Sequence, residues 1–138
     1  MPVILLPMAA RVEDWLRQAE HDLSVARTTS AAGQHDWACF AAQQAAEKAL
    51  KALYQHHHAE GWGHVLNRLL SGLVKDEPGL AAFEEAAKIL DKYYIPTRYP
   101  NGLEAGAPAD AYTPIESGMT IRYAETIIQF CAARCRVA

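Results

Sequence analysis

A short segment of the chain, residues 93–101, combines one arginine, three tyrosines and two prolines. Pro96 and Pro100 each fix their own φ and push the preceding residue toward extended geometry, which stiffens the segment. A planar, permanently charged guanidinium beside flat aromatic faces suits a ligand that carries a phosphate and a base, or a carboxylate and a ring. The segment therefore predicts a ligand site. Its candidate residues are Tyr93, Thr97, Arg98 and Tyr99.

Arg98 also has a structural interpretation. A buried arginine needs a partner of opposite charge, and the carboxylates of Glu47, Glu84 and Asp91 are the candidates for pairing with it. Such a pair would attach the loop to the rest of the protein. The two roles are compatible, because a loop held in this way can still line a cleft.

A second set of candidates lies on a predicted helix over residues 36–58. At 100° per residue, its polar side chains fall within an arc of roughly 140°, opposite an alanine-rich face. The polar residues are Gln43, Gln44, Glu47, Lys48 and Lys51. Gln44, Lys48 and Lys51 are candidates to line the same cleft as Arg98. Trp37 and Phe40 stand at the N-terminal end of the arc, so either another surface covers this stripe, or it is solvated and the two aromatics pack on a neighbouring helix.

Histidines form the third set. His64 follows Gly63 and has two interpretations: a hydrogen-bonding residue or general base of the site, or a residue that caps a short helix or closes the turn. It is the one weak candidate for a catalytic residue. The run His56–His58 resembles a metal cluster, but successive helical residues point about 100° apart and cannot jointly hold one ion. We therefore expect no metal site and no cofactor.

The elements that must position these residues are helices. Apolar residues recur at three- and four-residue steps, and no stretch alternates apolar and polar residues as a half-buried strand would. We predict an all-α, up-and-down bundle of four main helices and one short one, in a single domain over residues 11–138 that follows an N-terminal arm over residues 1–10. The predicted helices span residues 11–32, 36–58, 64–73, 80–94 and 115–134, with a long loop over 95–113.

Composition narrows the classes of function. The chain has 138 residues and a formal net charge of −3, which argues against a broad surface that coats nucleic acid. Three cysteines suit a reducing cytoplasm. The apolar N-terminus is too short for a membrane span and makes a poor secretion signal. The chain has no phosphate-cradling glycine loop, no Cys-x-x-Cys pair and no His-Glu-x-x-His zinc helix.

Several of these residues together resemble a known family, the HEPN domain (higher eukaryotes and prokaryotes nucleotide-binding). Residues 36–53, with the sequence DWACFAAQQAAEKALKAL, resemble the signature of its second helix. His64 at the start of a leucine-rich helix resembles a second landmark, and residues 97–100 (Thr-Arg-Tyr-Pro) resemble a third, found in a large prokaryotic subgroup. The resemblance covers residues 11–134.

The resemblance implies a four- or five-helix bundle, often a homodimer, in a prokaryotic cytoplasm. It also implies a separate minimal nucleotidyltransferase as partner, often in a two-component toxin–antitoxin module. Many members are ribonuclease toxins that carry an arginine, four to six residues and then a histidine near the start of the last helix. No pair here has that spacing, since Arg17 is too close to His21 and Arg27 too far from His35, and no histidine follows His64.

Two further departures concern carboxylates. The family more often has an acidic residue where Asn101 and Val65 stand here, and a site without those carboxylates is better suited to binding than to acid–base chemistry. We therefore predict a module that binds nucleotide or RNA and catalyses nothing alone. The alternatives are a metal-independent ribonuclease that uses Arg98, His64 and a tyrosine, and a purely structural interaction protein.

Overall fold

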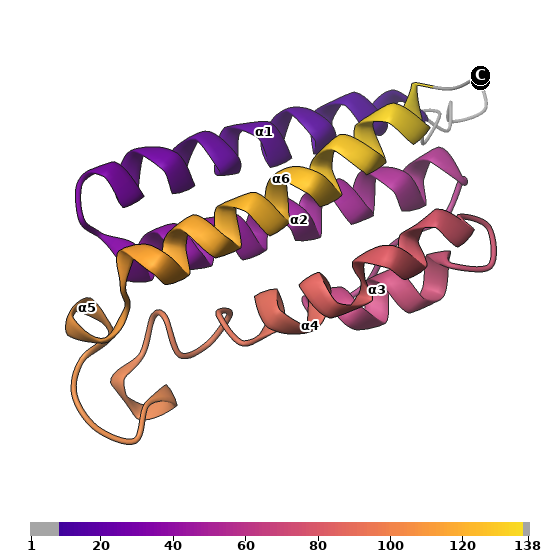
Figure 1. Cartoon of the computed structure of the whole chain (residues 1–138). Coiled ribbons are helices and arrows are strands. Elements are labelled where there is room, and N and C mark those ends of the chain that lie inside the picture. Colours follow the sequence, from indigo (N-terminus) through magenta and orange to yellow (C-terminus); the bar gives the residue numbers. More distant parts are fainter. Residues whose placement is uncertain (1–8, 137–138) are drawn as a thin grey trace, which may run out of the picture.

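The computed structural model describes residues 9–136, and the side chains of residues 11–136. Within that range all regular structure is helical, which confirms the predicted all-α bundle. The elements are α1 (Ala9–Ala31), α2 (His35–His56), α3 (Leu66–Leu73), the 3₁₀ helix η1 (Pro78–Phe83), α4 (Glu84–Asp91), the 3₁₀ helix η2 (Pro100–Gly102), α5 (Pro108–Ala111) and α6 (Pro114–Cys135). The long helices α1, α2 and α6 lie alongside one another, and α3 and α4 pack below α2 (Figure 1).

Helix α2 lies at the centre of the bundle and packs against α1, α3, α4 and α6. Of its 22 residues, 14 are buried. Half of these are alanines, whose small side chains let neighbouring helices approach closely and favour the helix itself. Their positions are Ala38, Ala41, Ala42, Ala45, Ala46, Ala49 and Ala52. The alternative of a solvated polar stripe is wrong for Gln43 and Glu47, which are 0% and 3% exposed. The other three residues of the arc, Gln44, Lys48 and Lys51, are partly exposed.

The N-termini of α2, α3 and α6 differ in how they are capped. Thr113 and Glu116 form a capping box at the start of α6, and Pro114 occupies its first turn. Asp36 lies in the first turn of α2, and Gln34 at the cap position makes no side-chain cap bond. At α3 the cap comes from a distant residue. The Asp91 carboxylate accepts hydrogen bonds from the backbone N–H groups of Leu66 (2.6 Å) and Asn67 (3.0 Å), so His64 does not cap this helix.

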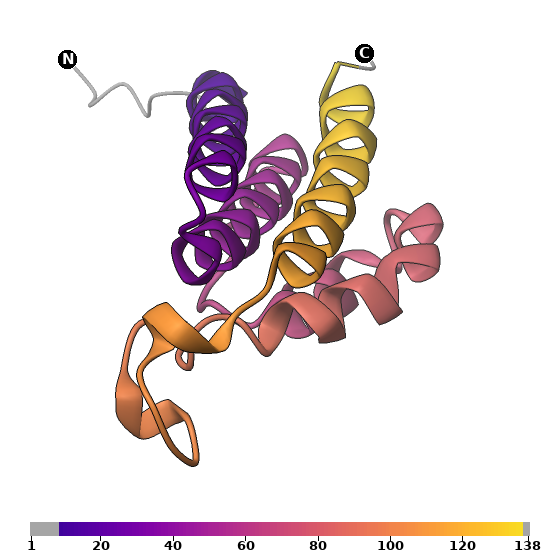
Figure 2. The same ribbon diagram turned by 60° about the vertical axis from the view of Figure 1, so that its left-hand side comes forward.

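The predicted helix over residues 80–94 is instead two shorter elements, η1 and α4. They are separated at Phe83, whose φ of −102° and ψ of 7° are not helical. Helix α4 ends at Asp91, three residues before the predicted end at residue 94. Figure 2 shows that residues 95–113, which include η2 and α5, extend from one end of the bundle below the start of α6.

Most of the predicted N-terminal arm, residues 1–8, lies outside the described residues, and α1 begins at Ala9. No helix among residues 9–136 combines the length and the apolar character that crossing a membrane requires. The three cysteines are free, and Cys39 and Cys131 are buried. Burial raises the pKa of Cys39 to about 11, so this thiol is protonated at neutral pH and acts as a packing residue.

Tyr54 of α2 fixes the position of α3 and depends on a glycine to do so. Its hydroxyl donates to the carbonyl of Leu69 (2.8 Å), and a Cβ added at Gly72 would overlap that hydroxyl oxygen. We expect Gly72→Ala to lower the free energy of unfolding by about 1–2 kcal/mol, because Tyr54 must move. The measurement is urea unfolding followed by circular dichroism.

The matched control is the same substitution in a Tyr54→Phe background. Without the hydroxyl, the new methyl would lie 3.4 Å from ring atom Cζ, an ordinary contact, and alanine favours a helix over glycine by up to about 1 kcal/mol. Gly72→Ala should therefore be neutral or stabilising in that background. Equal destabilisation in both backgrounds would show that the Tyr54 hydroxyl is not the obstacle.

Candidate functional site

The side chain of Arg98 lies among three aromatic rings. Its Cζ atom is 4.4 Å from the ring centroid of Phe40, 4.6 Å from that of Tyr94 and 5.3 Å from that of Tyr99. Its Nε donates a hydrogen bond to the carbonyl oxygen of Tyr94 (3.0 Å). Each ring face attracts the cation by about 0.5–1 kcal/mol at an exposed site, and more where water is excluded. These contacts hold the guanidinium in place without an anion.

No carboxylate among residues 11–136 forms an ion pair with Arg98, and neither of its Nη nitrogens hydrogen-bonds a described residue. The three carboxylates proposed as its partners are engaged elsewhere. Glu84 pairs with Lys88 (2.9 Å), and Asp91 caps α3. Glu47 binds Lys51 and His64. The ion-pair clamp expected as the structural role of Arg98 is therefore not formed.

His64 is oriented by a buried carboxylate. Its Nδ1 lies 3.1 Å from both carboxylate oxygens of Glu47, so Nδ1 carries the proton that it donates. Its ring stacks on Tyr94, with centroids 5.1 Å apart and planes 15° apart, and its carbonyl accepts a hydrogen bond from Gln43 (3.0 Å). The side chain is 54% exposed. Its Nε2 bonds no described residue, so a ligand can reach a histidine nitrogen whose orientation is already fixed.

Both candidate lysines have carboxylate partners. Lys51 pairs with Glu47 (3.0 Å) and lies 5.8 Å from the ring centroid of Trp15. Lys48 pairs with Asp22 of α1, and its Nζ is 3.5 Å from Oε1 of Gln44. Gln44 and Lys48 line a pocket that Phe40 also lines, whereas Lys51 lies against Trp15 of α1. The charge of each lysine is offset by a neighbouring carboxylate.

Thr97 and Tyr93 point into the protein. Thr97 is 1% exposed, and its hydroxyl donates to the carbonyl of Tyr93 (2.7 Å). The Tyr93 hydroxyl donates to the Glu116 carboxylate (3.0 Å), and its ring packs on Tyr112. Burial, together with the negative charge of Glu116, raises the pKa of Tyr93 above its usual range. These two residues hold the segment in place, whereas Tyr99 is 50% exposed and Arg98 is partly exposed.

Sequence reasoning did not assign Phe40, Tyr94 and Glu47 to the site. The nearness of Tyr94 to Arg98 in the same short segment is the local signal for this residue. The contacts of Phe40 and Glu47 with residues far along the chain have no local signal.

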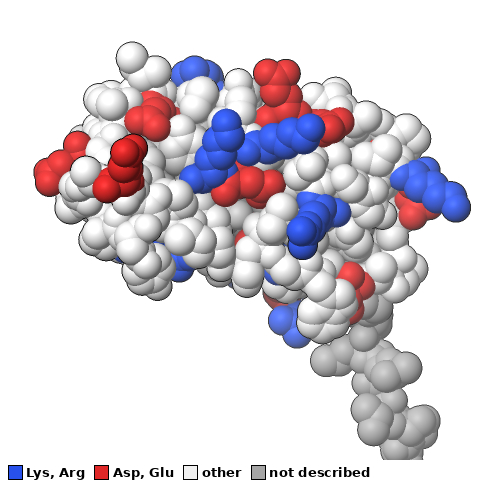
Figure 3. Space-filling view, turned by 90° about the horizontal axis from the view of Figure 1, so that it is seen from below, with Lys and Arg blue, Asp and Glu red and all other residues white. Residues whose placement is uncertain are grey.

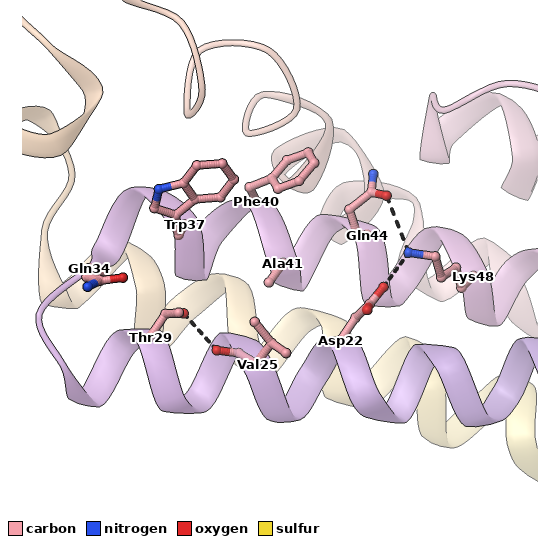
Figure 4. A pocket seen from close by; sticks show the side chains of 9 residues that line it. All are labelled: Asp22, Val25, Thr29, Gln34, Trp37, Phe40, Ala41, Gln44 and Lys48. Atoms are coloured by element: carbon pink, nitrogen blue, oxygen red, sulfur yellow. Dashed lines mark hydrogen bonds and ion pairs between the residues drawn. The ribbon is translucent and has the colours of Figure 1, made fainter.

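A groove of about 480 Å³ lies between α1 and α2, next to Phe40 (Figure 4). Its lining residues are Asp22, Val25, Thr29, Gln34, Trp37, Phe40, Ala41, Gln44 and Lys48. Trp37 is 49% exposed and meets Phe40 edge to face, with centroids 6.0 Å apart. Figure 4 shows both rings rising from the same side of α2.

Charged residues of both signs are mixed on one face of the molecule (Figure 3). On the face in Figure 3, Lys and Arg side chains lie among Asp and Glu, so this face presents no broad basic surface. Among the residues that the structure describes, no group of three or more His, Cys, Asp and Glu side chains is arranged to hold a metal ion. Of the histidine run, His57 bonds Glu77 (2.7 Å) and stacks edge to face with His56.

The sequence profile of the HEPN domain matches residues 12–134. Three solved structures are similar to the chain. A protein of Thermus thermophilus is 45% identical with a TM-score of 0.87, and the match covers 90% of this chain and 98% of that one. An archaeal HEPN homologue is 38% identical (TM-score 0.78; 91% and 98% covered). A HEPN domain protein of Thermotoga maritima is 34% identical (TM-score 0.72; 90% and 99% covered). No curated protein matches the chain.

Proposed function

The chain belongs to the HEPN domain family, and from that premise we propose that it is a binding module for nucleotide or RNA whose phosphate is held by Arg98. The observation that carries the proposal is the unpaired guanidinium. Arginines that are removed from water are normally paired with a carboxylate. Arg98 is partly buried, yet among the described residues its cation contacts aromatic rings and one backbone carbonyl and no carboxylate. Its two Nη groups offer the planar pair of donors that binds phosphate in bidentate fashion.

His64 and Tyr99 complete the proposed site. The exposed Nε2 of His64 can hydrogen-bond a phosphate or ribose oxygen, and the exposed ring of Tyr99 offers a face for stacking. We further propose that the protein is cytoplasmic, forms a homodimer and partners a minimal nucleotidyltransferase in a two-component system of the toxin–antitoxin type. These proposals rest on the family resemblance, including the subgroup with the Thr-Arg-Tyr-Pro segment.

A second candidate function is a metal-independent ribonuclease. The observation that favours it is the pair formed by His64 and Glu47, since a buried carboxylate that orients a histidine is a common arrangement for general acid–base catalysis. Arg98 would then stabilise the charge that develops on phosphorus. The missing arginine–histidine motif of the family's ribonucleases argues for binding alone.

Calorimetric titration with ATP, GTP and a short single-stranded RNA tests the proposed function. We expect binding of at least one of these ligands, and we expect Arg98→Ala to weaken it about tenfold or more, because a hydrogen bond to a charged group contributes about 1.5–3 kcal/mol. Arg122→Ala, which removes an exposed arginine of α6, is the matched control for charge. No heat with any ligand, or equal loss in both variants, would contradict the proposal.

The same samples separate the two candidate functions. The RNA recovered after titration in the presence of a chelator is analysed on a denaturing gel. A binding module leaves it intact. A metal-independent ribonuclease shortens it, and His64→Ala stops the cleavage.

A further inference from the structure

We propose that the groove between α1 and α2 is a base subsite, in which the aromatic base of the bound nucleotide stacks on Trp37 while its phosphate lies at Arg98. This inference rests on the proposed function and deepens it by assigning the second half of the ligand. Neither Trp37 nor α1 contributes to the phosphate site proposed at Arg98, His64 and Tyr99. We call this region the Trp37 groove, with the nine lining residues given above.

The Trp37 groove is continuous with the Arg98 face through Phe40. The Phe40 ring contacts the Arg98 guanidinium on one side and lines the groove with Trp37 on the other. Two parts of a single small ligand can therefore be bound by neighbouring surfaces without any rearrangement of α2. The volume of the groove falls within the range of about 300–1,000 Å³ that is typical of small-molecule sites.

The chemistry of the Trp37 groove favours an uncharged aromatic occupant. Its only charged side chains, Asp22 and Lys48, pair with each other and leave no net charge for a second phosphate to bind. Val25, Phe40 and Ala41 supply apolar walls. In this arrangement the negative phosphate of the ligand lies against the Arg98 cation, and its neutral aromatic ring lies in the Trp37 groove.

Trp37 is suited to stacking because it is exposed yet oriented. Half of its surface is open to solvent, and its edge-to-face contact with Phe40 restrains the ring. Its indole N–H has no hydrogen-bond partner among residues 11–136, nor does the side-chain amide of Gln34 at the rim. These groups can meet the polar edge of a base. A purine fits best, since its two fused rings overlap an indole more fully than one ring does.

Intrinsic tryptophan fluorescence and calorimetry test the inference with three probes: ATP, adenosine and tripolyphosphate. We expect ATP and adenosine to quench emission, and Trp37→Ala to abolish the quenching. We also expect Trp37→Ala to weaken the binding of ATP roughly tenfold, because stacking of one base on an aromatic residue contributes about that much affinity. The same substitution should leave the binding of tripolyphosphate unchanged. Trp62→Ala, which removes a more exposed tryptophan outside the groove, is the control and should retain both quenching and affinity.

Arg98→Ala separates failure of the subsite from failure of the proposed function. This substitution should weaken the binding of ATP and of tripolyphosphate, but adenosine should still quench the tryptophan emission. If Trp37→Ala binds ATP as the wild type does while Arg98→Ala does not, the base subsite is wrong and the phosphate site stands. If the wild-type protein binds none of the three probes, the base subsite is wrong, and the titrations with GTP and single-stranded RNA decide whether the proposed function also fails. If Trp37→Ala only turns a dimer into a monomer in sedimentation, the groove is a contact between copies, which also overturns the inference.

Discussion

Replacing Glu77 by glutamine is expected to lower the free energy of unfolding by about 3 kcal/mol at pH 7, the lower end of what loss of one member of a buried ion pair costs. Glu77 precedes η1 and is buried, yet its carboxylate binds His57 at the end of α2 (2.7 Å) and Arg134 in the last turn of α6 (2.7 Å). The Glu77 side chain thus joins the start of η1 to the ends of α2 and α6. The lower end of the range applies because both partners are partly exposed and regain water when the carboxylate charge is removed.

The pH dependence follows from the same contacts. Burial alone would raise the pKa of Glu77, but the hydrogen bonds from His57 and Arg134 and their positive charge outweigh it, so the pKa lies below its ordinary value of 4.5. A carboxylate with a lowered folded-state pKa stabilises the protein above the unfolded-state value, and this contribution is lost as the pH falls through the folded-state pKa. The difference in stability between wild type and Glu77→Gln should therefore shrink steadily below about pH 4.5.

Urea unfolding of both proteins between pH 7 and pH 3 provides the measurement. Glu85→Gln is the matched control, because Glu85 is exposed in the first turn of α4 and forms no ion pair with a described residue. The control should change stability by less than about 0.5 kcal/mol at either pH. A difference for Glu77→Gln that stays constant down to pH 3 would show that the carboxylate charge is not what joins the helices.

Enlarging an alanine at the centre of the bundle is the second substitution with a large expected effect. Ala46 of α2 is 0% exposed and belongs to the main core cluster. We expect Ala46→Leu to lower the free energy of unfolding by about 3 kcal/mol, because three added carbons must push apart helices that pack closely over alanine. Thermal unfolding followed by circular dichroism would show the loss as a lower melting temperature.

Ala133→Leu provides the comparison for this substitution. It makes the same chemical change at an exposed position of α6, where little packs against the side chain, so stability should stay within about 0.5 kcal/mol of the wild type. A melting temperature for Ala46→Leu that matches that of Ala133→Leu would mean that α2 has room around it, contrary to the packing described here.

The periodicity of apolar residues was sufficient to predict the fold class and the three long helices to within a few residues. It failed at the predicted helix over residues 80–94, because the break at Phe83 is a matter of backbone geometry that an apolar period does not reveal. It also failed to predict the cap of α3. The capping residue, Asp91, lies far along the sequence from Leu66 and Asn67, whose backbone N–H groups donate hydrogen bonds to its carboxylate. Local capping rules cannot detect partners of this kind.

The candidate site was predictable only in part. Arg98, Tyr99 and His64 were found by residue type, and the structure places Arg98 and His64 against the same ring of Tyr94. The sequence could not distinguish an ion-paired Arg98 from an unpaired one, because pairing depends on where the carboxylates point after folding. The predicted roles of these residues as ligand contacts remain proposals.

The burial of α2 has a consequence for the entropy of binding. Phe40 and Glu47, which position Arg98 and His64, stand on the helix that is most completely surrounded by the rest of the protein. A ligand therefore meets side chains whose rotamers packing has already restricted, and little conformational freedom is left to lose on association. Since each flexible side chain that is immobilised on binding costs about 0.5–1.5 kcal/mol, a site built on this helix can hold a small ligand with few direct contacts.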